Sequence, residues 1–415
     1  MSGGSRTLAV LCAGTLAVAL HAHPAAAQAT ETTRDWLVTL GVESGWESNV
    51  RFPEAGDSGD VVTRASGGIA HVIQTPRSRL SLGVAGSAAM FRKLDDMNQR
   101  TYSLLGSASR QLTPRFTVGV NGAVNTNYSR GVTYIADAPV LLPLTLWRQQ
   151  MGAGDVSYTF SPTLTGTANG SWNRVTFDSP LLVGGSTVRA QAGLTRRYAS
   201  DASIGFTTQF ERNITGGQTL DSSATGGAML DSTATAGETL DSYSLLGEWM
   251  RRYGRLELHL RAGAVVNGSA AEGAARVLPA AGAELTQRRA RGSTSLRYEH
   301  SVTQAYGLGR LVSTDQVALA TDVTTVRGFT FRVDGGESWS SDPSRSGFQY
   351  TLTSLNAGIQ QVVLSDVALG LAVFLRRAGG DYPHLNSYGV RATLNFAGSA
   401  GRIWGKKGPK PDTKK

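Results

Sequence analysis

The stretch Tyr388–Phe396, YGVRATLNF, constrains the fold more than any other part of the chain. Its even-numbered positions hold tyrosine, valine, alanine, leucine and phenylalanine, and its odd-numbered positions hold glycine, arginine, threonine and asparagine. Because successive side chains of a strand point to opposite faces, this segment predicts a ribbon with one apolar face and one polar face. A soluble sandwich would turn the polar face to bulk water. A membrane barrel would turn it to a wet lumen and the apolar face to lipid.

The N-terminus predicts export. Arg6 is followed by the apolar run Leu8–Leu20 and by an A-x-A cleavage motif at Ala25–Ala27, with Ala27–Ala29 as a second candidate. This pattern predicts a secretory signal peptide over residues 1–27, and its apolar run is too short to span a bilayer as a helix. The sequence has one cysteine, Cys12, and it lies inside this run. We therefore expect the mature chain to lack disulfides and thiol chemistry.

Composition narrows the choice further. The chain is 40% hydrophobic and only 17% charged, which is too apolar for a disordered protein and low in charge for a soluble surface. Beyond the predicted signal peptide, no apolar run is long enough for a transmembrane helix. The formal charge of +9 includes a net +5 from the segment after Gly398. Because the basic excess sits mostly at one end, we expect no nucleic-acid partner.

Alternating runs recur along the chain and are separated by connections of two kinds. The first run places Trp36, Leu40 and Trp46 on one face and Glu43 and Glu47 on the other. Longer polar loops centre near residues 137, 180, 225, 272, 306, 342 and 381. Short turns alternate with these loops, and we predict them at Thr75–Ser78, Leu112–Arg115, Ser161–Pro162, Ser200–Asp201, Tyr253–Gly254, Thr324–Thr325 and Ser365–Asp366. Short turns at one end and long loops at the other are typical of outer-membrane barrels.

The fold prediction is an all-β, transmembrane, antiparallel up-and-down β-barrel of the bacterial outer membrane. We predict about 18 strands, with a range of 14–18 and 16 as the main alternative, because one weak pair near residues 281–301 is hard to count. The barrel is expected over residues 28–396, followed by a basic periplasmic tail over residues 397–415. A barrel of this size leaves an aqueous channel unless loops fold inward.

A hexapeptide starting at Gly217 recurs at Gly227 and Gly237, a spacing of ten residues. A calcium site would need six to eight oxygen ligands, and the repeat supplies one carboxylate per copy, at Asp221, Asp231 and Asp241. The period also differs from that of calcium-binding β-helices. We therefore interpret the repeat as an expanded external loop, without a metal.

The sequence offers no enzyme site. His300 and Ser301 are adjacent, but strand alternation places them on opposite faces, so they cannot act as base and nucleophile. We expect His300 to lie at the lipid interface beside the aromatic residues. His259 shares the inward face with Glu257 and Arg261, which is more typical of a local charge cluster. No metal-ligand spacing or phosphate-binding loop emerges, so no cofactor is predicted.

The polar face of the predicted strands carries a nearly balanced set of charges. One interpretation is that these charges set an electric field across a pore and bias which solutes pass. The alternative is that they pair across strands and keep the lumen wet. The predicted lumen-lining residues are Glu43, Glu47, Arg189, Arg197, Glu211, Glu248, Arg252, Glu257, Arg261, Arg297, Glu299, Asp322, Arg332, Asp334, Arg376 and Arg391.

Two short motifs resemble a family of outer-membrane β-barrel porins whose genes often accompany exopolysaccharide biosynthesis. Glu47–Val50, ESNV, resembles the end of that family's first strand, and Tyr298–Val312 resembles its late strand–loop–strand unit. The resemblance implies a passive outer-membrane channel linked to polysaccharide secretion, with no catalytic or cofactor residues.

The same Tyr388–Phe396 stretch resembles the C-terminal signal read by the barrel-assembly machinery, through Tyr388, Gly389, Leu394 and Phe396. That signal usually ends the chain, whereas 19 residues follow Phe396 here. The expected partners are outer-membrane lipid, the assembly machinery, and polysaccharide or small solutes.

Two functions from different classes remain open at this stage. The first is a porin-like channel, either general or for polysaccharide export. The second is a barrel plugged by its own loops, which binds a partner through external loops or the basic tail. A soluble secreted β-protein is a third, weaker alternative.

Overall fold

The structure is a computed structural model, and it describes residues 32–50, 59–135, 138–179, 182–215, 239–269, 276–305, 310–326, 328–341, 349–380 and 385–399. Over these residues the chain forms 18 β-strands and one short 3-10 helix. The elements are β1 (Thr33–Glu47), β2 (Asp60–Gln74), β3 (Ser78–Phe91), η1 (Asp95–Met97), β4 (Gln99–Thr113), β5 (Phe116–Ile135), β6 (Ala138–Ser161), β7 (Leu164–Phe177), β8 (Gly185–Ala199), β9 (Ala202–Thr215), β10 (Thr239–Tyr253), β11 (Leu256–Ser269), β12 (Arg276–Arg289), β13 (Gly292–Ala305), β14 (Arg310–Thr324), β15 (Phe329–Ser341), β16 (Gln349–Leu364), β17 (Val367–Gly380) and β18 (Leu385–Ser399).

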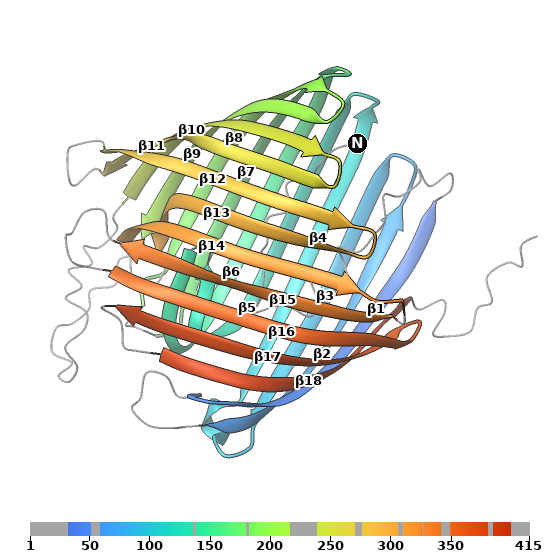
Figure 1. Cartoon of the computed structure of the whole chain (residues 1–415), viewed down its shortest axis with the longest axis vertical. Coiled ribbons are helices and arrows are strands. Elements are labelled where there is room, and N and C mark those ends of the chain that lie inside the picture. Colours follow the sequence, from blue (N-terminus) through green and yellow to red (C-terminus); the bar gives the residue numbers. More distant parts are fainter. Residues whose placement is uncertain are drawn as a thin grey trace, which may run out of the picture.

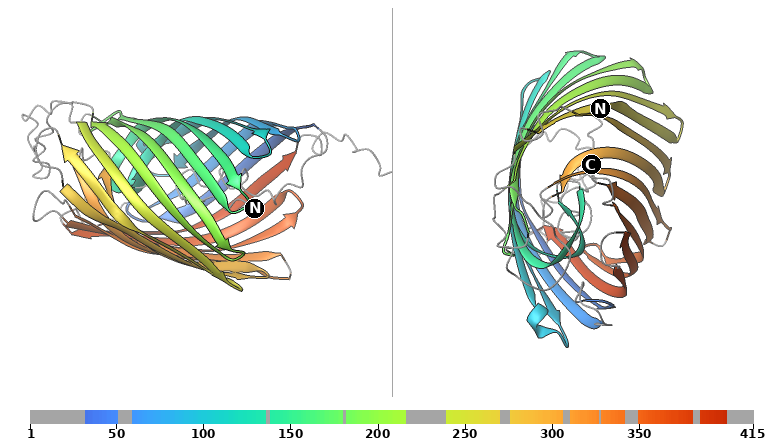
Figure 2. Two further views of the ribbon diagram at one scale, coloured as in Figure 1. Left: turned by 90° about the horizontal axis from the view of Figure 1, so that it is seen from above. Right: turned by 90° about the vertical axis from the view of Figure 1, so that its left-hand side faces the viewer.

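The strands close into one antiparallel barrel (Figures 1 and 2). Each strand pairs with the next in sequence, and β1 pairs with both β2 and β18. Closure satisfies the backbone groups of every strand within the sheet, which a hydrocarbon environment demands because lipid offers no hydrogen-bond partner. The predicted all-β barrel and its count of 18 strands are therefore confirmed.

Connections differ in length between the two ends of the barrel. The predicted turns coincide with short connections, such as residues 75–77 between β2 and β3 and residues 200–201 between β8 and β9. Most of the predicted long loops fall at the opposite end, where residues 216–238 join β9 to β10. The long loop predicted near residue 137 is wrong, because β5 and β6 continue as paired strands to Ile135 and Ala138. The pair near residues 281–301 proves to be β12 and β13, joined by Ala290–Arg291. This turn was hard to predict because it contains no proline, aspartate or asparagine.

The two faces of the sheet differ in exposure and in chemistry. In β1, Trp36, Leu40 and Val42 are 47%, 56% and 48% exposed and share one face, and in β18, Tyr388 and Leu394 do the same at 53% and 46%. The alternate positions are mostly more shielded and polar. A closed ring shields its concave side, so the apolar face is the outer one. On the inner side, Arg261 of β11 reaches Glu299 of β13 across the intervening strand β12.

Aromatic side chains form contacts on the outer face near both ends of the barrel. Near the loop end, the rings of Trp46 and Tyr388 have their centroids 5.4 Å apart. Near the turn end, Tyr158 contacts Phe116 and Phe160, with centroids 6.2 and 4.8 Å apart. Amphipathic rings prefer the two membrane–water interfaces, so this placement marks the upper and lower limits of a membrane-spanning band.

The hairpin formed by β5 and β6 folds into the barrel. Its register shifts between Ser129 and Gly131, and the strands continue beyond this bulge to Ile135 and Ala138. Bulges bend a ribbon, and Figure 2 shows the end of this hairpin curling into the interior. There β6 contacts β13, although the two strands are not neighbours in the sheet. The lumen is therefore narrowed from one side by a strand hairpin.

A small apolar cluster lies at the loop end, where Met97 of η1 packs with Val50, Val62 and Phe91. Beside it, the carboxyl of Asp60 is 1% exposed and accepts hydrogen bonds from the backbone N–H groups of Lys93 and Leu94 at 2.9 and 3.0 Å. A strand of 15 residues exceeds the roughly 9–11 needed to cross hydrocarbon, so Asp60, the first residue of β2, lies outside the membrane-spanning part.

Burial would raise the pKa of Asp60, but these N–H donors, that of Val61 and the charge of Lys93 hold it below its usual value.

Three predictions concern segments that lie wholly or mostly outside the described residues. The signal peptide of residues 1–27, the segment beyond Ser399 and repeat residues 217–238 lie outside the described residues. Strand β18 runs to Ser399, past the predicted barrel end at Phe396, because Ala397, Gly398 and Ser399 pair with β1. The last repeat copy, which we expected in a loop, ends inside β10. Among the described residues, no helix has the length and apolarity to cross a membrane.

Candidate functional site: a charged inner wall

The structure places the predicted lumen charges on the face opposite the exposed apolar side chains in every strand concerned. They come from strands far apart in sequence that the barrel brings around one interior. Glu43 and Glu47 lie on β1, Arg189 and Arg197 on β8, Glu211 on β9, Glu248 and Arg252 on β10, Glu257 and Arg261 on β11, Arg297 and Glu299 on β13, Asp322 on β14, Arg332 and Asp334 on β15, Arg376 on β17, and Arg391 on β18.

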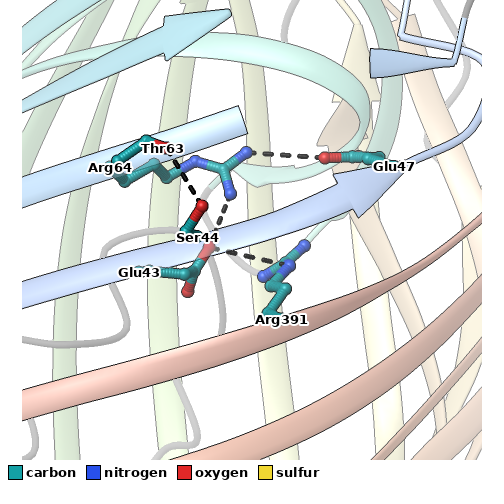
Figure 3. Close-up of polar contacts among 6 residues, drawn as sticks. All are labelled: Glu43, Ser44, Glu47, Thr63, Arg64 and Arg391. Atoms are coloured by element: carbon teal, nitrogen blue, oxygen red, sulfur yellow. Dashed lines mark hydrogen bonds and ion pairs between the residues drawn. The ribbon is translucent and has the colours of Figure 1, made fainter. Parts of the chain in front are cut away.

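One group of charges lies where the first and last strands meet. We call Glu43, Glu47, Arg64 and Arg391 the seam cluster (Figure 3). Arg64 Nη1 lies 2.6 Å from Glu43 Oε1, and its Nη2 lies 3.5 Å from Glu47 Oε2. Arg391 Nε lies 3.7 Å from the same Glu43 oxygen. Glu43 thus stands between two guanidinium groups. The sequence reasoning missed Arg64, although it shares its parity with Ser66 and Gly68 in an alternating run.

An aromatic ring supports the seam cluster from β17. Phe374 is 6% exposed, and the guanidinium carbons of Arg391 and Arg376 lie 4.1 and 5.2 Å from its centroid. The ring also covers Gly389, where a Cβ would lie 2.6 Å from Phe374 Cε1 and 2.4 Å from the carbonyl oxygen of Trp46. Gly389 was predicted as part of an assembly signal. Its position in the fold gives it a packing role as well.

A second group lies on β10, β11 and β13. Glu248 accepts a hydrogen bond from Thr207 at 3.2 Å and lies 3.7 Å from His259 Nε2. Arg261 Nη2 lies 3.3 Å from Glu299 Oε1, and Arg297 contacts the other oxygen of Glu299. Because Glu248 and Arg261 are register neighbours on β10 and β11, these two groups lie side by side as a charged band on the inner wall.

Other charges form smaller pairs. Arg189 lies 2.7 Å from Glu211, which is 8% exposed. Near the turn end, Glu257 binds Arg252 at 2.9 Å and Arg288 at 3.0 Å. Further contacts are those of Ser293 to Asp322 at 2.6 Å, Arg332 to Asp334 at 3.1 Å, and Arg197 to the carbonyl of Pro162 at 2.8 Å.

The sequence reasoning also missed Glu284 and Arg288, which lie on the inward positions of β12. Glu284 accepts a hydrogen bond from Thr286 at 3.2 Å. The alternation of Gly282, Glu284, Thr286 and Arg288 with Ala283 and Leu285 carries the signal that would have found them. It was obscured because the boundaries of this strand pair were uncertain.

His300 lies on the outer face, together with Tyr298 and Asp315. His300 Nδ1 lies 2.9 Å from Asp315 Oδ1, and the Tyr298 hydroxyl donates to the same oxygen at 2.8 Å. Ser301 sits on the inner face, as its parity predicts. Among the described residues, the hydrogen-bond partner of the His300 ring is the carboxylate of Asp315 rather than a serine or threonine hydroxyl. Likewise, the described residues contain no cluster of metal-binding side chains.

A closed antiparallel barrel with an apolar outer band, aromatic residues at both limits and a charged interior is a transmembrane β-barrel of the outer-membrane type. No family model matches the chain, and no curated protein matches it.

Among solved structures, Acinetobacter baumannii OccAB4 is similar at 10% identity and a TM-score of 0.48, over 89% of this chain and 99% of that one. Pseudomonas aeruginosa OccK9 (OpdG) is similar at 12% identity and 0.48, over 88% and 98%. The P. aeruginosa outer membrane protein opdK is similar at 11% and 0.47, over 88% and 99%. The strand pairing itself, rather than these likenesses, defines the fold described above.

Proposed function

We propose that the protein is a porin-like, passive channel of the bacterial outer membrane for hydrophilic solutes. One observation carries this proposal: a closed ring of 18 strands turns apolar side chains outward and ionised or hydrogen-bonding side chains inward. Charged groups are costly to bury without water or partners, so a wall of this kind favours a wet lumen. A ring of this strand number is also wide enough for an aqueous path.

Single-channel recording in planar bilayers tests the proposal. Purified protein is expected to give stable openings in KCl. Protein that inserts into the bilayer, shown by protection of its strands from protease, and yet stays silent would overturn the proposal.

The inward hairpin of β5 and β6 favours a second candidate, a plugged barrel that binds a partner through its loops or basic tail. Strand β6 contacts β13, although the two are not neighbours in the sheet. A silent wild-type protein whose conductance appears after the hairpin is shortened would support the plugged barrel.

A narrower proposal is that the transported material includes an exopolysaccharide. It draws on the resemblance of Glu47–Val50 and Tyr298–Val312 to porins associated with exopolysaccharide biosynthesis. Deleting the gene and measuring secreted polysaccharide tests it, and unchanged secretion with normal polymer length would contradict it. The same mutant, complemented with the chain ending at Ser399, tests whether the proposed periplasmic tail takes part.

A further inference from the structure

The inner wall is chemically divided. We define the neutral wall as the inward-facing residues of β3 to β7. In the described residues of β4, β5 and β7, every inward side chain is uncharged, while β3 and β6 contribute Arg79 and Asp155. Hydroxyl and amide side chains predominate on this wall, among them Ser87, Thr101, Ser107, Asn121, Asn125 and Asn169.

The ring geometry sets this neutral wall opposite β12 to β16, which together carry more inward charges. Most of these lie on β12, β13 and β15, while β14 contributes Asp322 and the described inward positions of β16 are uncharged. β5 and β14 are nine places apart in either direction around the 18-strand ring. The charged band of β10 to β13 and the seam cluster therefore flank the far side of the lumen. Figure 2 shows the strands of β3 to β9 forming one side of the barrel and those of β12 to β18 the other.

Several groups of the neutral wall face open space inside the barrel. Ser107, Asn121 and Asn169 are exposed although they point inward. Other side chains of the wall form hydrogen bonds with each other: the hydroxyls of Ser87 and Thr101 lie 2.7 Å apart, and the Gln149 amide donates to Asn173 at 2.8 Å. The wall thus presents amides and hydroxyls that can both donate and accept, with few fixed charges to hold a tight hydration shell.

We propose that the neutral wall is the path of uncharged polyhydroxylated solutes, of the size of small oligosaccharides. This proposal rests on the channel function proposed above and names its substrate class. A sugar hydroxyl needs a partner that both donates and accepts when it loses water, and an amide or hydroxyl offers both. A charged solute must in addition give up part of its hydration in a lumen narrowed by the β5–β6 hairpin.

The neutral wall also differs from a tight binding site. Its hydroxyl and amide groups are spread over five strands. Its inward aromatic side chains are Phe91, Trp147 and Phe177 at the loop end, and Phe91 and Trp147 are each only 6% exposed, so they offer little ring surface to a solute. The described inward positions of β4 and β5 carry no aromatic ring. Stacking on aromatic rings is a strong source of affinity for planar or ring-shaped ligands. We therefore expect weak, non-saturating passage.

Osmotic swelling of proteoliposomes compares three probes of nearly equal size: lactose, the anionic lactobionate and the cationic lactosamine. Lactose is expected to enter at least about threefold faster than either charged probe. If a channel that conducts KCl passes lactose no faster than both charged probes, the neutral-wall proposal is wrong while the channel function stands. Planar bilayers that show no conductance with the inserted protein would contradict both the neutral-wall proposal and the channel function.

A variant pair locates the path. Asn121→Leu with Asn125→Leu removes two amides from β5, and we expect lactose entry to fall about threefold while KCl conductance changes little. The matched control, Gln316→Leu with Asn356→Leu, removes two inward amides from β14 and β16. Equal loss of lactose entry in both pairs would overturn the assignment to β5. Should either variant fail to fold, the comparison of the three probes on the wild-type protein still decides the substrate class.

Discussion

At the residue scale, Gly389 shows how backbone contact limits the choice of side chain. A Cβ there would lie 2.4 Å from the carbonyl oxygen of Trp46 and 2.6 Å from the ring of Phe374, both at the seam of the barrel. We expect Gly389→Ala to lower the free energy of unfolding by about 1–3 kcal/mol, the usual cost of overpacking. Denaturant unfolding in lipid vesicles measures this. Gly247→Ala, where the nearest atom would be 3.7 Å away, is the control and should change stability little.

Asp60 links the fold of the loop end to pH. Its pKa is lowered in the folded state, so its contribution to stability is present above the unfolded pKa of about 3.9 and is lost as the pH falls through the folded value. We therefore expect the segment from Arg92 to Asn98 to stay ordered at neutral pH and to loosen below about pH 4. Hydrogen exchange of the Lys93 and Leu94 amides, corrected for its intrinsic pH dependence, measures this. Asp60→Asn should weaken protection at pH 7, and equal protection in both proteins would contradict the assignment.

The carboxylate of Glu43 partly neutralises the guanidinium groups of Arg64 and Arg391. The substitution Glu43→Gln removes the carboxylate that Arg64 and Arg391 share, so the net charge of the seam cluster becomes more positive. We expect the ratio of chloride to potassium permeability to rise about twofold. The reversal potential in a KCl gradient measures this ratio. Glu337→Gln removes a charge from the outer face of β15 and should leave the ratio unchanged.

At the element scale, the hairpin of β5 and β6 enters the lumen and is expected to limit its width. The register shift at Ser129–Gly131 accompanies its inward bend, and β6 contacts β13. Removing residues 132–141 should widen the narrowest part of the lumen and raise single-channel conductance about twofold. The outer face is untouched by this deletion, so thermal stability in detergent should change little. Unaltered conductance would show that the hairpin does not bound the path of ions.

At the scale of the whole molecule, pairing of opposite charges limits ion selectivity. Nearly every inward carboxylate described above has an arginine, histidine or hydroxyl partner, and both signs occur in each cluster. Paired charges produce a weak net field, so we expect the potassium and chloride permeabilities to lie within about threefold of each other. A strong preference for one ion would contradict this prediction.

The sequence by itself determined the two faces of the wall. Strand alternation has a period of two, so Tyr388, Val390 and Leu394 had to share one face and Arg391 the other, wherever the strand lay. The same alternation placed His300 and Ser301 on opposite faces. The turns at Pro162 and Gly254 were predicted separately, from the backbone preferences of proline and glycine. At Ala290–Arg291 the rule had no turn residue to detect, and there the inward Glu284 and Arg288 were missed.

Only the tertiary structure decided which residues of distant strands meet. The contacts of Arg391 with Glu43, and of Gly389 with the carbonyl oxygen of Trp46, depend on closure of the ring between β18 and β1, which no local pattern encodes. The inward course of the β5–β6 hairpin follows from a bulge and from its contact with β13. The division of the lumen into a neutral wall and a charged wall likewise required the strand order, because it sets segments nine strands apart to face each other.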